Sequence, residues 1–170
     1  DVGRQRRRVH GDEDVRSVLK DAGIDEEKAR IIALFVRGNL ERARDIDWDA
    51  VQEKRRAAWE LFRALATRTG SAAFLRRFAF SRRSEAKEEL PETLEVFASF
   101  ARDALVLLEG ADPGLLFNPD YEPEIRACLP SLEPERAVRI LGAIETAEDG
   151  LSRSFNLGLL STSFYSQAIG

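Results

Sequence analysis

The chain has 170 residues, of which 44% are hydrophobic and 33% are charged, and its 30 acidic and 26 basic residues give a net charge of −4. This composition is not that of a disordered chain, and no apolar run approaches the roughly eighteen residues that a membrane span needs. The acidic balance argues against a general nucleic-acid binder. With one cysteine, Cys128, and no basic-then-apolar leader, the sequence predicts a cytoplasmic protein. Because methionine is absent and the sequence starts at Asp1, we also expect a piece of a longer protein.

Apolar residues recur with a period of 3.6 almost everywhere after residue 11, so the sequence predicts an all-α fold. Three short helices are expected within residues 1–46, behind a basic tail that holds four arginines. The expected N-terminal caps are Asp12, Asp25 and Asn39, and the expected terminators are Gly23 and Gly38. We therefore predict two domains, a three-helix segment over residues 1–46 and a helical bundle over residues 47–170.

The second domain is expected to open with a helix from the cap Asp47 to about Thr69. Its predicted inward residues are apolar, and its predicted outward residues are polar or charged. The inward set is Val51, Ala58, Leu61, Phe62 and Leu65, and the outward set is Gln52, Glu53, Arg55 and Arg56. Residues 72–80 then carry more apolar side chains than a solvent-facing helix of that length should, so we expect something to cover them.

The central helix of the bundle is expected at residues 94–108, where apolar residues alternate in threes and fours. Pro91 either starts this helix or kinks a longer one that begins near Ser84, and the sequence leaves both open. A connection follows over residues 110–123, and then a short helix with Cys128 on its inward side. The next helix is predicted to start at Pro134, and a last element spans about 157–169.

A search for catalytic and metal-binding motifs gives negative expectations. There is no P-loop pattern, and one cysteine with one histidine, His10, cannot make a zinc set. The acids at Asp45, Asp47 and Asp49 begin like a calcium loop, but the glycine and glutamate that such a loop needs are missing. We expect Cys128 to be a buried, inert thiol. The sequence thus predicts no enzyme activity, no metal and no cofactor.

The positive signal for function is a group of aromatic and arginine residues. Phe74 and Phe78 alternate with Arg76 and Arg77, and arginine and aromatic side chains are enriched where subunits meet. An alternative hypothesis is a helical nucleic-acid-binding module that uses the N-terminal arginines and the arginines of residues 76–83. It predicts an affinity that falls steeply with salt.

The order of motifs resembles the C-terminal part of the delta-prime subunits of the bacterial DNA polymerase III clamp loader. Residues 31–43 resemble the lid of an AAA+ module, in which Arg42 matches a sensor-type arginine. Residues 97–105, with the pair Arg102-Asp103, resemble an aromatic-x-x-Arg-Asp-Leu-Leu helix, and residues 117–120 match an Asn-Pro-Asp turn. Residues 152–160 resemble the closing Arg-Asn-x-Asn-x-x-Leu segment. The family's patterns are not matched at Ala104, Ser154 and Leu157.

The resemblance implies an AAA+ lid followed by a collar, the domain through which five clamp-loader subunits form a ring. It implies a non-catalytic scaffold in DNA replication, with the gamma/tau and delta subunits as partners and DNA contacted only through the complex. A gamma/tau-type collar remains an alternative to a delta-prime-type one. The interface candidates are Phe74, Arg76, Arg77, Phe78, Arg102 and Asp103. For Arg42 an ordinary surface position is an alternative to a sensor role, and for Arg102 and Asp103 a solvated pair is an alternative to an ion pair between helices or subunits.

Overall fold

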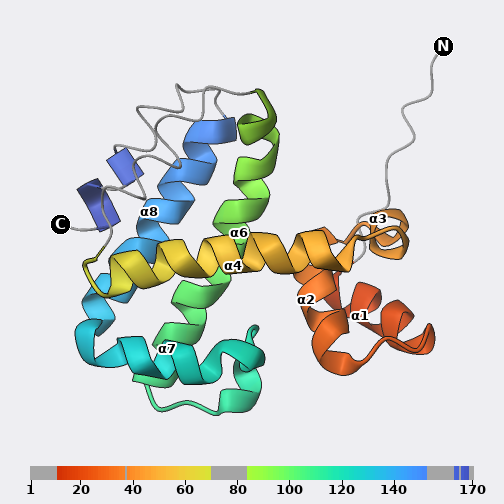
Figure 1. Cartoon of the computed structure of the whole chain (residues 1–170), viewed down its shortest axis with the longest axis horizontal. Helices are drawn as coiled ribbons and strands as arrows, with labels where there is room; N and C mark the ends of the chain where they lie inside the picture. Colours follow the sequence, from red (N-terminus) through yellow and green to blue (C-terminus); the bar gives the residue numbers. More distant parts are fainter. Residues whose placement is uncertain (1–10, 37, 70–83, 153–162, 165, 169–170) are drawn as a thin grey trace. The chain divides into compact units, whose positions relative to one another are not determined.

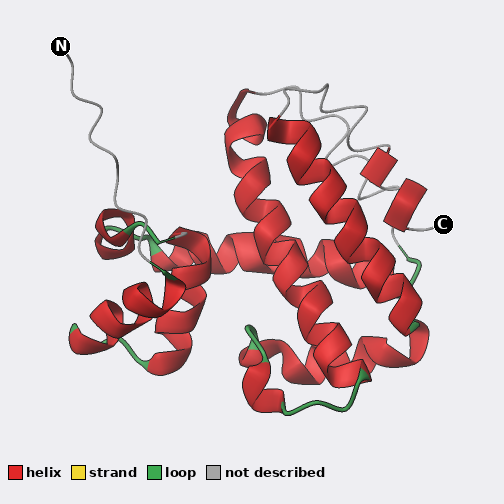
Figure 2. Cartoon of the chain, turned by 180° about the vertical axis from the view of Figure 1, so that it is seen from behind, coloured by secondary structure: helices red, strands yellow, loops and turns green. Residues whose placement is uncertain are grey.

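The computed structural model describes residues 11–36, 38–69, 84–152, 163–164 and 166–168, and these residues form helices and no strands (Figures 1 and 2). The predicted all-α fold is confirmed. The chain divides into two compact units, Asp1–Glu53 and Lys54–Gly170. The division falls inside a helix, whereas the sequence puts the domain boundary just before that helix, at residues 46 and 47.

The first unit contains α1 (Asp12–Asp21), α2 (Glu26–Val36) and α3 (Leu40–Arg44), which are three short helices, as predicted. Two predicted N-terminal caps are confirmed: Asp25 Oδ1 accepts from the Lys28 N–H at 3.0 Å, and Asn39 Oδ1 accepts from the Arg42 N–H at 3.1 Å. The expected terminators Gly23 and Gly38 have φ angles of 83° and 74°, which favour glycine. One apolar cluster holds the unit together, and its buried members are Val15, Leu19, Ala29, Ile32, Ala33, Val36 and Ala43.

The predicted cap of α1 is wrong. Gly11 precedes the helix, and its N–H donates to Asp14 Oδ2 at 3.2 Å, so Asp12 is the first helical residue. Around this helix, Glu26 accepts from Arg16 at 2.7 Å and pairs with Lys20. The hydrogen bonds from Lys20 and Arg16 lower the pKa of Glu26 from 4.5 to about 2. This cluster of charges ties the end of α1 to the start of α2.

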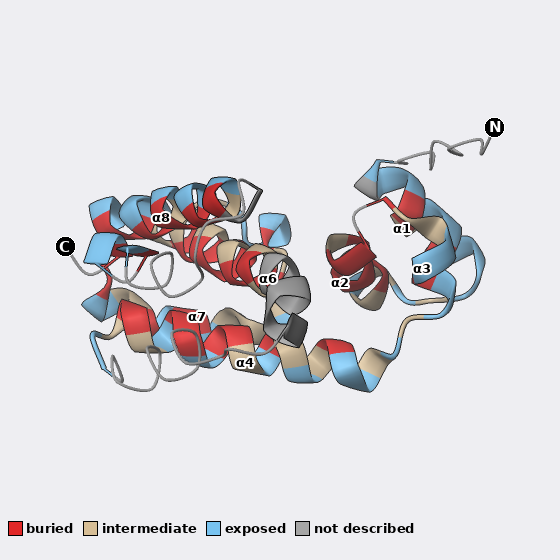
Figure 3. Cartoon of the chain, turned by 90° about the horizontal axis from the view of Figure 1, so that it is seen from above, coloured by how far each residue is buried: buried red, intermediate tan, exposed pale blue. Residues whose placement is uncertain are grey.

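The helix α4 (Trp48–Ala66) is capped by Asp47, whose Oδ1 accepts from the N–H groups of Asp49 and Ala50 at 3.0 and 3.2 Å. The predicted cap is confirmed. All five predicted inward residues of this helix are buried, and its buried and exposed residues alternate along the ribbon in Figure 3. Of the predicted outward residues, Arg55 is an error, because its side chain is fully buried.

The second unit is built around α6 (Ser84–Leu108) and α8 (Pro134–Ser152), which lie side by side in Figures 1 and 2. The residues of α4 that follow Glu53 cross α6 and pack on it through aromatic rings. Phe62 lies 6.0 Å from Phe97 and 6.4 Å from Phe100 between ring centroids, and Trp59 lies 5.4 Å from Phe100. Buried aromatic pairs of this kind contribute both apolar area and about 1 kcal/mol of specific ring contact each.

The alternatives left open at Pro91 are resolved, because α6 is one helix that contains this proline. The predicted connection over residues 110–123 contains two short 3-10 turns, η1 (Pro113–Leu115) and η2 (Pro119–Tyr121). The short helix predicted after it is confirmed as α7 (Glu122–Cys128), in which Cys128 is buried, and the 3-10 turn η3 (Leu129–Ser131) follows. Pro134 is the first residue of α8, as predicted. Among the described residues, no helix combines the length and the apolar character that a membrane crossing requires.

Candidate functional site

The strongest polar feature of the second unit is a set of side chains that joins α4, α6 and the turn at η2. We call Arg55, Ser99, Asp103, Asn118 and Asp120 the buried polar network. The first four are buried, and the Asp120 side chain is 31% exposed. Four of the five, all but Arg55, lie in the segments 97–105 and 117–120 that carry the family resemblance.

Arg55 enters the network from α4. Its Nη1 and Nη2 donate to the two carboxylate oxygens of Asp120 at 2.8 and 2.7 Å, and Nη2 also donates to Asn118 Oδ1 at 3.0 Å. The guanidinium lies 5.1 Å from the ring centroid of Tyr121. Such a two-pronged arginine–carboxylate pair is stronger than a single contact and fixes the orientation of both groups. Arg55 therefore anchors the turn at η2 to α4.

Asp103 enters the network from α6, with a side chain that is fully buried. Its oxygens accept from the N–H groups of Phe117 and Asn118 at 2.9 and 2.8 Å, and from Asn118 Nδ2 at 2.9 Å. Asn118 Nδ2 also donates to Ser99 Oγ at 2.9 Å. Burial raises the pKa of Asp103 above its usual value of 3.8, while the hydrogen bonds from Phe117 and Asn118 oppose the rise.

These contacts correct the prediction for Asp103. A solvated position is wrong, because the side chain has no exposed surface. A direct contact with a partner subunit is wrong for the same reason, since the oxygens already accept bonds from within the chain. The ion pair with Arg102 exists, at 3.3 Å, but it joins neighbours on one helix. The role of Asp103 is to bind two successive backbone N–H groups of the loop, as a helix cap does.

Arg102 has a different position, with a side chain that is 41% exposed. Its Nη1 donates to the Leu115 carbonyl oxygen at 3.0 Å, and its guanidinium lies 4.2 Å from the ring centroid of Phe117. Leu115 itself is 54% exposed. Arg102, Leu115 and Phe117 thus form a partly apolar edge with a cation over an aromatic ring. A partner can reach this edge, and it stays an interface prediction.

The other predicted site residues lie apart from the network. Arg42 is exposed on α3 in the first unit, and its backbone N–H is held by the Asn39 cap. Phe74, Arg76, Arg77 and Phe78 lie outside the described residues. Cys128 is buried, as expected, and burial raises the pKa of its thiol. Within the described ranges, no group of three or more His, Cys, Asp or Glu side chains is arranged to hold a metal ion.

Sequence reasoning missed Arg55 because it sorted the residues of α4 by charge. The spacing held a usable signal, since Val51, Arg55, Ala58 and Phe62 follow one another at intervals of four, three and four, which is one face of a helix. A charged residue inside such a stripe is buried with a partner. Comparison of the chain with protein-family models, curated proteins and solved structures gave no significant match.

Proposed function

We propose that this chain is a non-catalytic scaffold: the lid and collar of a delta-prime-type subunit of a bacterial clamp loader. In this role the second unit packs against the collars of gamma/tau and delta subunits in the bacterial cytoplasm. It keeps the ring assembled while other modules hydrolyse ATP, and it contacts DNA only through the complex. The chain itself uses no cofactor.

One observation carries this proposal. The Arg-Asp pair and the Asn-Pro-Asp turn are two separate motifs of the resemblance, and they meet in one network through Asp103, Asn118 and Asp120. Residues that share one structural task support a common architecture better than isolated matches in the right order do. The sequence of three short helices followed by a larger helical unit supports the proposal in the same way.

Two surfaces are the candidates for assembly. The first is the partly apolar edge formed by Arg102, Leu115 and Phe117, where an arginine lies beside exposed apolar surface. The second is the segment with Arg76 and Arg77, which is a prediction from sequence alone. Interfaces of this type depend on a few aromatic and arginine side chains that lose their water on association.

The test is size-exclusion chromatography with light scattering on the full chain, alone and mixed with the gamma/tau and delta subunits of the same source. The proposal predicts a larger complex in the mixture, weakened in the double variant Arg76→Glu and Arg77→Glu or in Arg102→Glu. Arg56→Glu, an exposed position on α4, is the matched control and should leave assembly unchanged. Separate elution at micromolar concentrations contradicts the proposal. DNA binding that falls steeply with salt would instead favour the nucleic-acid-binding alternative.

A further inference from the structure

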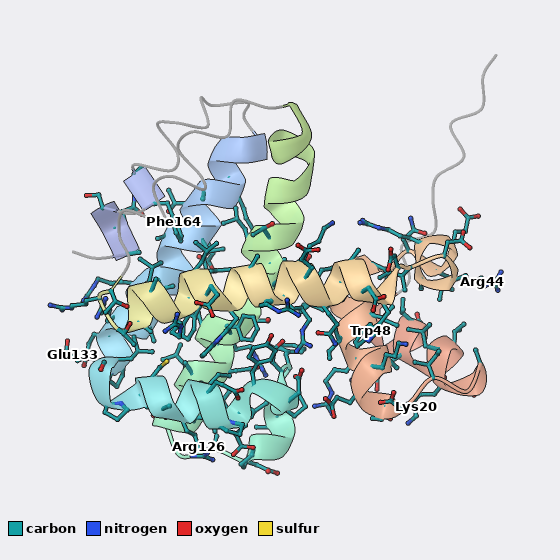
Figure 4. All side chains as sticks on the ribbon, viewed as in Figure 1. Lys20, Arg44, Trp48, Arg126, Glu133 and Phe164 are labelled. Atoms are coloured by element: carbon teal, nitrogen blue, oxygen red, sulfur yellow. The ribbon has the colours of Figure 1, made fainter. Side chains whose placement is uncertain are left out.

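Three arginines gather where α4 ends and α8 begins. Arg136 is 1% exposed, and it donates through Nη1 to the Ala66 carbonyl oxygen at 3.4 Å and through Nη2 to the Leu65 carbonyl oxygen. Arg68 is exposed and follows Ala66 by two residues, and Arg139 is exposed one helical turn after Arg136. Figure 4 labels Glu133 at the turn that leads into α8, beside this end of α4.

The charge of this arginine group is not balanced by acids. In the part of the chain that the structure describes, none of the three forms an ion pair with a carboxylate. Burial lowers the pKa of Arg136, the charges of Arg68 and Arg139 lower it further, and the charge of Glu133 acts against them. The carbonyl end of α4 offsets roughly half a charge. Arg136 is buried, whereas Arg68 and Arg139 are exposed, so two of the three arginines are open to solvent.

The group also holds an unused donor. Arg136 Nε is buried and finds no acceptor among the described residues, although buried N–H groups are nearly always hydrogen-bonded. A third observation concerns Arg68, which lies two residues after the end of α4 at Ala66 and has a φ angle of 57°. Glycine is the usual residue in this position, and an arginine there costs about 1 kcal/mol. The strained residue thus brings a further guanidinium to the same end of the helix.

We propose that Arg68, Arg136 and Arg139 form a binding site for a phosphate-type oxyanion. Arg68 and Arg139 contact the anion from the solvent side, and Arg136 supplies a fixed positive charge beneath them. Arginine suits this role because its planar group donates several hydrogen bonds to tetrahedral oxyanions. The site lies at a different place from the Arg102 edge, and it does not depend on the proposed assembly function.

The experiment is an NMR titration of the full chain with inorganic phosphate, against chloride at matched ionic strength. The arginine Nε–H signals are the readout, and the Arg136 signal identifies the buried donor. We expect a saturable shift at millimolar phosphate that chloride does not produce. Arg139→Gln should weaken phosphate binding by about tenfold or more, as expected for the loss of a charge-assisted hydrogen bond, while Arg139→Lys should retain part of it.

Arg56→Gln is the matched control, because it removes one exposed positive charge from the same unit. Arg68→Gln provides a second test, and far-UV circular dichroism checks that each variant keeps its helices. A parallel titration with a short single-stranded oligonucleotide tells whether the phosphate source is free or part of a nucleic acid. Binding of either probe that Arg139→Gln weakens and Arg56→Gln does not supports the site. No saturable binding of either probe, or equal weakening by both variants, overturns it.

Discussion

Replacing Arg55 by methionine tests whether the buried polar network stabilises the second unit. Methionine fills most of the space of the arginine stem but removes the charge and the three hydrogen bonds to Asp120 and Asn118. Breaking a buried pair by removing one partner costs about 3–5 kcal/mol when the other charge stays buried. The Asp120 side chain is 31% exposed, so water can take up its charge. The acceptor on buried Asn118, in contrast, loses its partner.

We therefore expect Arg55→Met to lower the free energy of unfolding by about 2–4 kcal/mol. For a domain of this size, about 3 kcal/mol corresponds to a fall of roughly 6–12 °C in Tm. Urea unfolding followed by far-UV circular dichroism measures the first quantity, and a thermal scan measures the second.

The matched control is Arg56→Met, the same change at the exposed neighbouring position. It should alter stability by less than about 0.5 kcal/mol. A double-mutant cycle with Asp120→Asn isolates the pair and should give a coupling of about 1 kcal/mol or more. If Arg55→Met and Arg56→Met destabilise the chain equally, the network is not what holds the η2 turn, and the reasoning is refuted.

Four further predictions concern Asp103, Gly142, Gly23 and Glu26. Asp103→Asn should lower the free energy of unfolding by about 2–4 kcal/mol, because the new amide hydrogens face buried N–H donors of Phe117 or Asn118. Urea unfolding at neutral pH measures this loss. Gly142→Ala should stabilise the chain by about 0.5–1 kcal/mol, because its Cβ meets nothing within 4 Å in a helix interior. Gly23→Ala should destabilise it by about 1 kcal/mol, because φ is 83° there. In one thermal assay the Tm of Gly142→Ala should therefore lie above that of Gly23→Ala, and the opposite order would contradict this explanation. The pKa of Glu26 is lowered from 4.5 to about 2, so its contribution to stability is present above pH 4.5 and is lost as the pH falls towards 2. Glu26→Gln should remove that part of the acid dependence, and a carboxyl NMR titration of Glu26 should give a midpoint well below 4.5.

The fold class and most helix boundaries follow from local rules. Caps such as Asp25, Asn39 and Asp47 act through the N–H groups two or three residues away, and a left-handed glycine such as Gly23 ends a helix by its own backbone. These interactions lie within a few residues of one another, so a single sequence contains them. The error at Asp12 is small for the same reason, since Gly11 and Asp14 supply the cap instead.

The candidate site could not be predicted in the same way, because its contacts join distant residues. Arg55 and Asp120 are 65 positions apart, and Arg136 and Leu65 are 71 apart. The sequence does indicate which of these charged side chains are buried. Arg55, Asp103 and Arg136 each occupy a position of an apolar helical stripe, such as Arg136 before Ile140 and Ala143. Spacing therefore predicts that these charged residues are buried, while only the folded chain identifies their partners.

The bonding partners of the motif residues are stronger support for a family relationship than the motif letters alone. An Arg-Asp pair on a helix is common, and alone it favours no family. A buried aspartate that binds the backbone of a turn 14 and 15 residues later needs a particular loop length and an asparagine at one position. The proposed family relationship therefore depends less on the identity of Arg102 than on the joint presence of Asp103, Asn118 and Asp120. Because these side chains are bonded within the chain, the proposed assembly requires other residues, and the exposed Arg102 edge is the described surface on which interface variants should be concentrated.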